Sequence, residues 1–284
     1  MKVIPFSIPK TSKEAFRLQV DKQPYFYDKL HQHPEIQIMH IVKGEGTLIA
    51  GDHVGRFSHG DLFLIGSGQP HVFRNDKTYY DSKKKSGVHA ISLFFDEKYA
   101  GESFWQLDEL QAVHQFLVNS ELGYRIESNT KVLILDIINQ LPQSHGINKV
   151  ISFFQLLKIL TESKELTPLC VAPANSSYNV AEGKRMNDIL HFTFSQSHRK
   201  IKIEEVAEIA NLSSEAFCRY FKMRTRKTYT NFINEVRISN ACKMLIEKEK
   251  TIQEICYEVG FSNLSHFNRT FKKVTRKTPK AYLP

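Results

Sequence analysis

The chain has 284 residues and a mass of 32.9 kDa, which suggests about two domains at the usual ~100–200 residues each. Its composition, 41% hydrophobic and 24% charged, excludes a disordered or fibrous protein. No apolar run approaches the ~18 residues of a membrane span, and the first residues lack a signal core. Four cysteines without CxxC or Cys/His spacing argue against a zinc module or a disulfide scaffold. We expect a soluble, cytoplasmic protein that makes no membrane contact, and its formal charge of +9 needs an explanation.

Residues 20–100 have the pattern of short alternating strands separated by glycines. The predicted strands include His31–Val42, Gly46–Ala50 and Asp61–Ile65. Seven glycines between residues 44 and 68 mark turns at near-regular intervals. This spacing predicts a small β-sandwich or barrel.

Two motifs in this region resemble those of the cupin family. The matching residues are His31, His33, Gln37 and Gly44 in the first motif, and Gly60, Gly66, Gly68, His71 and Asn75 in the second. Three positions depart from the family pattern. Gln37 replaces the usual glutamate, Gly66 replaces a proline, and Tyr25 stands where a glycine is expected. The resemblance implies a cupin-like fold for residues 1–105.

The chemistry of this cluster has three interpretations. His31, His33 and Gln37 alternate along the predicted strand and so share one face, and His71 joins them from another strand. Imidazoles suit a first-row metal, but an amide in place of a carboxylate weakens a divalent site. Alternatively the four residues line a pocket for a small polar effector, such as a sugar or another polar metabolite. In the third interpretation they are strand-end residues satisfied by backbone and water.

We favour the effector pocket, with no cofactor required. Glu35 shares the strand face and could supply the missing carboxylate, but its spacing does not fit the motif.

Residues 106–166 have helical periodicity. Apolar stripes recur at Leu110–Leu117, at Val132–Ile138 and at Val150–Leu160. Such apolar helix faces more often pack in the core of the same subunit. The alternative is that they pair two subunits.

The positive charge lies entirely in the last third of the chain. Residues 167–180 hold two prolines and no charge, which predicts a linker. Beyond it, residues 181–284 carry 20 Lys and Arg against 11 Asp and Glu, whereas residues 1–180 are neutral overall. A basic domain beside a neutral one indicates a polyanionic partner, usually nucleic acid.

The basic segment contains an internal repeat. Residues 203–232 recur as residues 252–282, and Thr-Arg-Lys-Thr occurs at 225–228 and again at 275–278. The residues that match at an offset of 50 include Phe217, Arg219, Phe221 and Lys222 with Phe267, Arg269, Phe271 and Lys272. A diffuse basic surface would not repeat in this way.

The sequence pattern of each copy of the repeat predicts a helix, a short turn and a second helix. Apolar residues at 0, 3, 4 and 7 spacing give each first helix a buried face, and the second copy opens on a capping box at Thr251. Asn211 and Gly260 tolerate the left-handed conformation that ends a helix. Ser213 and Ser262 are placed to cap the second helices. The chain therefore contains two predicted helix-turn-helix units.

In such a unit the second helix enters the major groove of duplex DNA. The predicted DNA-binding residues are Glu215, Ala216, Cys218, Arg219, Lys222, Ser265, His266, Asn268, Arg269 and Lys272. Arginine can bind guanine through two hydrogen bonds and asparagine can read adenine, while lysine more often holds phosphate. The alternative is a solvated helix face, which two matched copies disfavour. A helical connector over residues 229–248 would place the two reading helices in successive grooves, about 34 Å apart.

Residues 255–282 resemble the C-terminal signature of AraC/XylS-type transcriptional regulators. The resemblance rests on Gly260-Phe261-Ser262, on the matched second helix, and on Thr278-Pro279 and Tyr282. The connector, with Arg237-Ile238, is similar to the central helix of that family. Two positions depart from the pattern: Arg276 stands where glycine is usual, and Leu283 where arginine is usual.

The sequence thus predicts an α+β multidomain protein. A cupin-like β-sandwich or barrel (1–105) and a helical segment (106–166) precede a linker (167–180) and an all-α domain with two helix-turn-helix units (181–284). The resemblance implies a homodimeric, sequence-specific regulator, expected to be an activator. It would bind double-stranded DNA and an effector and would contact RNA polymerase. The alternatives are a metal-dependent cupin enzyme fused to a DNA-binding domain, and an architectural protein that contacts only phosphates.

Overall fold

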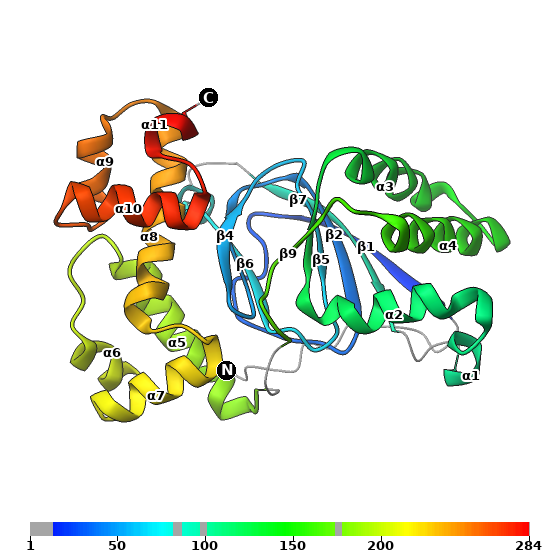
Figure 1. The fold of residues 1–284 in the computed structure, drawn as a ribbon, viewed down its shortest axis with the longest axis horizontal. Helices are drawn as coiled ribbons and strands as arrows, with labels where there is room; N and C mark the ends of the chain where they lie inside the picture. The colour runs from blue at the N-terminus through cyan, green and yellow to red at the C-terminus, as the bar shows by residue number, and fades with distance from the viewer. Residues whose placement is uncertain (1–13, 82–86, 97–100, 174–177, 284) are drawn as a thin grey trace. The chain divides into compact units, whose positions relative to one another are not determined.

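The computed structural model describes residues 14–81, 87–96, 101–173 and 178–283 (Figure 1). They form two compact units. The N-terminal unit contains the described part of residues 14–46 and 57–173, and the C-terminal unit contains residues 47–56 and 178–283. The predicted class, a β-rich cupin region followed by a helical domain, is confirmed.

The strands form two sheets. A six-stranded sheet has the order β1-β7-β2-β5-β8-β9 and is antiparallel in every pair, and a three-stranded sheet has the order β4-β3-β6. The bounds are β1 Phe16–Gln23, β2 Ile36–Lys43, β3 Gly46–Ala50, β4 His53–Phe57, β5 Leu62–Ile65, β6 His71–Asn75, β7 Val88–Phe95, β8 Tyr124–Ile126 and β9 Leu166–Pro168.

The predicted strand from His31 to Val42 is too long at its start. Strand β2 begins only at Ile36, because Pro34 lacks the N–H that a central strand needs. His31 pairs with His71 in an isolated bridge, and His33 lies in the irregular stretch between this bridge and the bend before β2. The face-sharing argument for these histidines is therefore wrong, because Gln37 is the one member of the trio within β2.

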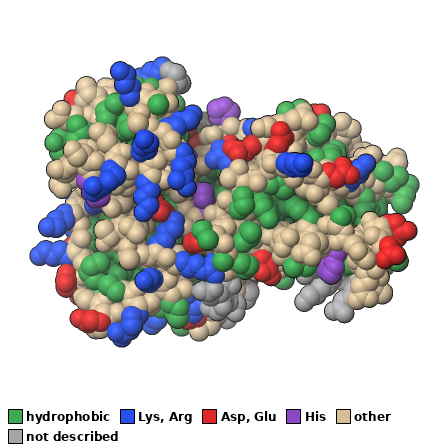
Figure 2. All heavy atoms as spheres, viewed as in Figure 1, with side chains coloured by type: hydrophobic (Ala, Val, Ile, Leu, Met, Phe, Trp, Pro, Cys, Tyr) green, Lys and Arg blue, Asp and Glu red, His purple; other side chains and the backbone are tan. Residues whose placement is uncertain are grey.

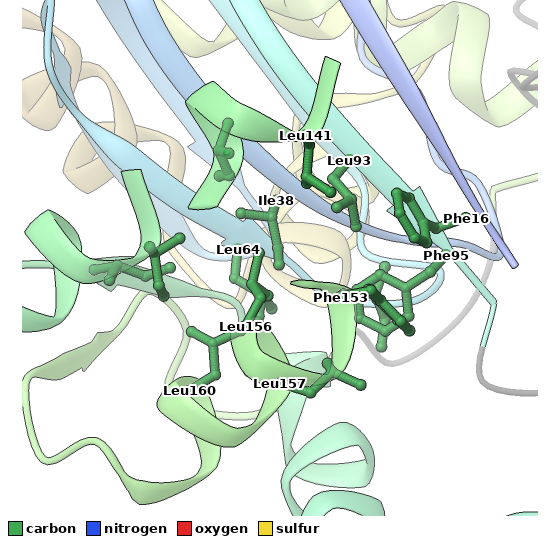
Figure 3. Packing of buried hydrophobic residues seen from close by; sticks show 14 of the residues in the cluster. Phe16, Ile38, Leu64, Leu93, Phe95, Leu141, Phe153, Leu156, Leu157 and Leu160 are labelled. Carbon is green, nitrogen blue, oxygen red and sulfur yellow. The ribbon is translucent and has the colours of Figure 1, made fainter. Parts of the chain in front are cut away.

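Helices cover one face of the six-stranded sheet. Their bounds are α1 Glu102–Trp105, α2 Gln111–Asn119, α3 Ser128–Gln140 and α4 Ile147–Glu162. Ile38, Leu64 and Leu93 from the sheet pack with Phe153 and Leu157 of α4 in one buried cluster (Figure 3). Most of the predicted apolar stripes thus pack in this core, as expected for helices that cover a sheet.

Two strands were not predicted. β8 and β9 add to the edge of the six-stranded sheet, and β9 falls at the start of the segment predicted as a linker. Leu169 and Cys170 beyond it are also buried, so this part of the segment belongs to the N-terminal unit. No helix in the described ranges is long and apolar enough to cross a membrane.

The remaining helices belong to the C-terminal unit. Their bounds are α5 Val180–Gln196, α6 Ile203–Ile209, α7 Ser214–Thr225, α8 Tyr229–Glu247, α9 Ile252–Glu258, α10 Leu264–Thr275 and α11 Pro279–Tyr282. Helices α6 and α7 form the first helix-turn-helix unit and α9 and α10 the second, with α8 between them (Figure 1).

The predicted turns are nearly all confirmed. Asn211 and Gly260 have positive φ angles of 53° and 101°. The Ser213 side chain caps α7 by accepting from the Ala216 N–H at 3.3 Å. The prediction for Ser262 is wrong, because α10 begins one residue later and Asn263 supplies its cap. An Asn carbonyl caps a helix as well as a Ser hydroxyl does, and sequence alone does not separate two adjacent candidates.

Aromatic contacts repeat in the two units as the sequence does. The ring centroids of Phe217 and Phe221 are 5.7 Å apart, and those of Phe267 and Phe271 are also 5.7 Å apart. All four side chains are fully buried. Each pair also meets an aromatic ring of the helix that follows, so both copies fold around the same kind of core.

Arg237 of α8 joins three elements of the C-terminal unit. Its guanidinium donates to the carbonyl oxygens of Ser197 at 2.8 Å and Arg199 at 2.7 Å, just beyond the end of α5. It also lies 5.7 Å from the ring centroid of Phe261, in the turn between α9 and α10. A Cβ on the neighbouring Gly260 would lie 2.5 Å from the Ser197 oxygen and 2.9 Å from Arg237 Nε.

We predict that Gly260→Ala destabilises the C-terminal unit by about 2–4 kcal/mol, because both its positive φ and the clash oppose a side chain. Far-UV circular dichroism during urea unfolding, which is dominated by the helices, reports the loss. Gly146→Ala is the matched control, since Gly146 has φ 56° and open space around it. Gly146→Ala should destabilise the N-terminal unit by about 1–2 kcal/mol. This loss should appear as a lower urea midpoint in the fluorescence of Trp105, the single tryptophan of the chain. Equal and small effects of the two variants on the circular dichroism would contradict the role of Gly260.

Candidate functional site

The reading faces of α7 and α10 lie opposite their buried phenylalanines. Nine of the ten predicted DNA-binding side chains are exposed, and Ala216 is half-buried. The exposed residues are Glu215, Cys218, Arg219 and Lys222 on α7, and Ser265, His266, Asn268, Arg269 and Lys272 on α10. Each face offers donors that can reach base edges or phosphates from the second helix of a helix-turn-helix unit.

The two faces differ at their first position. Glu215 lies in the first turn of α7, where its own backbone N–H and the Ser213 hydroxyl lower the pKa of its carboxyl group. Arg219, one turn further on, lowers that pKa as well. Ser265 holds the equivalent place on α10 and is uncharged. An ionised carboxylate can accept a hydrogen bond from cytosine N4, whereas a serine hydroxyl can both donate and accept, so the two helices expose different hydrogen-bonding groups at this position.

Several basic residues of the C-terminal unit are engaged in ion pairs within it. Arg199 donates to the Glu205 carboxylate at 2.8 Å and so holds α6 against the end of α5. Arg224 of α7 pairs with Glu182 of α5, and Lys227 pairs with Glu235 of α8 at 2.6 Å. These charges position helices, and the exposed Lys and Arg form the basic surface of this unit, of which one face is visible in Figure 2.

Three histidines converge in the N-terminal unit. One ring nitrogen from each of His31, His33 and His71 lies within 4.8 Å of the others. The β-bridge between His31 and His71 brings two of them together, and the Gly68 N–H binds the His33 carbonyl at 2.8 Å. His33 and His71 are buried, and His31 is half-buried.

The three rings share one tautomer. Nδ1 of His31 lies 2.8 Å from the Lys29 carbonyl oxygen, and Nδ1 of His71 lies 2.8 Å from that of Gln69. Nδ1 of His33 lies 2.9 Å from the carbonyl oxygen of Glu35. A carbonyl oxygen only accepts, so each Nδ1 carries the proton and each Nε2 of a neutral ring holds a lone pair.

Burial keeps the rings neutral. Burial lowers the pKa of His31 to about 4 and that of His71 well below its usual range, and neighbouring histidines lower both further. Burial also lowers the pKa of His33, although the Glu35 carboxylate opposes the shift. The Nε2 atom of His33 is buried and makes no hydrogen bond among the described residues. A lone pair of this kind is suited to a ligand.

Gln37 and Glu35 lie on different sides of the cluster. The Gln37 amide donates to the Ser92 hydroxyl at 3.2 Å, and the Gln37 side chain also interacts with the His33 ring and raises its pKa. The Glu35 carboxylate lies 3.7 Å from Nδ1 of His33 and does not belong to the group of converging ligand atoms. Glu35 therefore interacts with the His33 ring at Nδ1 and does not complete the ligand set. The spacing of residues in the sequence did not separate these two roles.

The geometry defines a two-part protein: a C-terminal unit with two helix-turn-helix units, and an N-terminal unit with a histidine cluster. Comparison with known domain families agrees with both parts. The family of helix-turn-helix domains matches residues 206–284, and the family of cupin domains matches residues 20–79.

Curated relatives carry the same arrangement along the chain. The uncharacterized HTH-type transcriptional regulator YdeC of Bacillus subtilis is 26% identical over 287 residues, covering 94% of this chain and 90% of YdeC. The uncharacterized HTH-type transcriptional regulator SAR0107 of Staphylococcus aureus is 20% identical and covers 87% of this chain. The match spans 31% of SAR0107, so this chain corresponds to about a third of that protein.

Solved structures include similar chains. ToxT from Vibrio cholerae covers 95% of this chain and 98% of its own length, with 14% identity and a TM-score of 0.36. A probable AraC family transcriptional regulator from Rhodopseudomonas palustris covers 35% of this chain and 94% of its own, with 22% identity and a TM-score of 0.34.

Residues 206–284 thus match a helix-turn-helix domain family and residues 20–79 a cupin family, and the chain as a whole is similar to HTH-type transcriptional regulators of the AraC type. Its curated relatives are named as regulators, so the enzyme alternative is not favoured.

Proposed function

We propose that this regulator recognises a specific DNA sequence through α7 and α10, and that a ligand bound at the histidine cluster controls it. The observation that carries the DNA-binding proposal is the repeat itself. Two arginines, Arg219 and Arg269, are exposed at the same place on two helices that fold around equivalent phenylalanine pairs. Contacts that served only general attraction to DNA would not require this matched geometry.

The regulatory mechanism follows from differential affinity. A ligand can shift the protein between states only if it binds one state better than another. We propose that the favoured state of a homodimer places its reading helices on the operator, and that the outcome is activation through contact with RNA polymerase. This role places the protein in the cytoplasm.

Exposed apolar side chains on α3 and α4 support the homodimer proposal. Val132 and Leu133 of α3 are 54% and 43% exposed, and Ile147 and Ile151 of α4 are 70% and 48% exposed. Val132 belongs to a predicted stripe yet does not enter the core. Water-exposed aliphatic side chains gathered on two neighbouring helices are typical of an interface.

We predict that Ile147→Lys combined with Ile151→Lys converts a dimer to a monomer in sedimentation velocity, because both charges would be buried without partners. Val171→Lys is the control, since Val171 is 91% exposed but lies away from α3 and α4 in the sequence. A doubly substituted protein that still sediments as a dimer would exclude this surface.

The histidine cluster fits a divalent transition metal ion. Three neutral imidazoles with converging nitrogens form a ligand set suited to Zn, Fe, Ni or Cu, and hydrogen bonds from each Nδ1 to a carbonyl orient such ligands in metal sites. The buried, unpartnered Nε2 of His33 is the observation that supports the fit. When bound, the ion would supply positive charge that ties the β6 start to the segment before β2. A polar organic effector at the same residues stays the alternative.

For DNA recognition, we predict that Arg219→Ala and Arg269→Ala each weaken binding to the selected operator by about 1–3 kcal/mol, because each removes a base contact. Binding to random duplex should change much less. Selection from a random duplex library identifies the operator, and competition with random DNA measures the ratio. Lys184→Ala, an exposed basic residue of α5, is the control. Equal losses on operator and random DNA would support the architectural alternative instead.

For the cluster, we predict near-equimolar binding of Zn²⁺ or Co²⁺ to the chelator-treated protein by calorimetry, with affinity lowered about 100-fold or more in His33→Ala. Co²⁺ should also develop the visible absorption of a low-symmetry site. His40→Ala is the control, because His40 is a buried histidine of β2 outside the cluster. Metal binding that is equally weak in all three proteins would favour an organic effector.

A further inference from the structure

Both reading helices end on an arginine in the left-handed conformation. Arg226 follows α7 with φ 55°, and Arg276 follows α10 with φ 62°. The backbone N–H of each arginine donates to the carbonyl of the lysine four residues earlier, at 2.8 Å and 3.0 Å. The two copies therefore share this feature in backbone geometry as well as in residue type.

The threonine ahead of each arginine fixes the turn around it. Oγ1 of Thr225 donates to the Phe221 carbonyl and accepts from the Lys227 N–H at 3.3 Å. Oγ1 of Thr275 makes the equivalent contacts, the second of them at 3.2 Å. The backbone on each side of the arginine is thus held before any partner binds.

Arginine is not the residue that this backbone favours. Only glycine, and less often asparagine or aspartate, adopts the left-handed region at little cost. The same unit uses Asn211 and Gly260 in the left-handed turns inside its two helix-turn-helix units. A basic side chain near a helix C-terminus gains some favourable dipole interaction, and Lys248 at the end of α8 has the same geometry without following a reading helix. Lys248 therefore serves as an internal control.

The two arginines stand at the ends of the reading helices, where the phosphates of a DNA strand would lie. Each stands seven residues after a reading arginine and four after a reading lysine, directly beyond the last residue of its helix. A helix of 12 residues is about 18 Å long, whereas the major groove is about 12 Å wide. When the first turns of α7 and α10 contact base edges, their last turns reach the phosphates that border the groove.

We propose that Arg226 and Arg276 are phosphate-binding residues, one for each reading helix, which anchor the ends of α7 and α10 on the sugar-phosphate backbone. The inference rests on the proposed entry of these helices into the major groove. Arg226 and Arg276 would make phosphate contacts, whereas Arg219 and Arg269 would make base contacts. Phosphate contacts set register and affinity but carry no base preference.

Arg226→Gly and Arg276→Gly test the proposal, because glycine suits the backbone while it removes the charge. Each change should weaken binding about fivefold at 0.15 M salt, equally on operator and random duplex, and should lower the salt slope by about 0.9. The melting temperature should stay level or rise. Arg→Lys at either position should retain most of the affinity, and Arg226→Asn provides a second uncharged variant that accepts this backbone.

Lys248→Gly is the matched control, with the same backbone change and the same loss of charge. It should leave affinity and salt slope as in the wild type. The proposal would be overturned if Arg226→Gly and Arg276→Gly had the same DNA affinity and salt slope as Lys248→Gly. If Arg219→Ala keeps its selective effect in that case, the reading role of α7 stands and only the anchoring role fails. If no variant changes binding, groove entry itself is wrong.

Discussion

The half-buried guanidinium of Arg237 makes the contact on which the DNA-binding unit depends. It satisfies two backbone carbonyls beyond the end of α5 and packs over Phe261 in the second helix-turn-helix turn. Because α8 also forms the core beneath α9 and α10, this one side chain ties the first half of the unit to the second. Gly260 is required beside it, since any side chain would enter the same space. The spacing of the two reading helices thus depends on a polar contact inside an otherwise apolar core.

The two units divide the work by electrostatics. In the C-terminal unit, carboxylates such as Glu205 and Glu235 neutralise the basic residues that position helices, and the exposed cations remain available to DNA. In the N-terminal unit, burial lowers the pKa of three imidazoles, and one ring nitrogen of each lies within 4.8 Å of the others. The proposed attraction to DNA therefore uses exposed charged side chains, whereas the proposed ligand site uses buried neutral ones.

Much of the C-terminal unit could be predicted from sequence, because the two copies of the repeat gave the same pattern of helices and turns twice. The buried phenylalanine pairs, Asn211 and Gly260 followed from periodicity and turn chemistry. The strand break before β2 did not, since alternation continues through Pro34 while its missing N–H ends the ladder. Short strands β8 and β9 carry too few residues for a periodic signal. The convergence of His71 with His31 and His33 depends on an isolated bridge between distant segments, which motif spacing indicates only by resemblance.

The central claim is that two matched helices occupy successive major grooves on one face of the duplex. Guanine N7 methylation protection on the selected operator measures this directly, because N7 lies in the major groove. We expect two protected groups of guanines about one helical turn apart, on the same face of the DNA. Protection confined to one groove, or strong binding with no N7 protection, would contradict it.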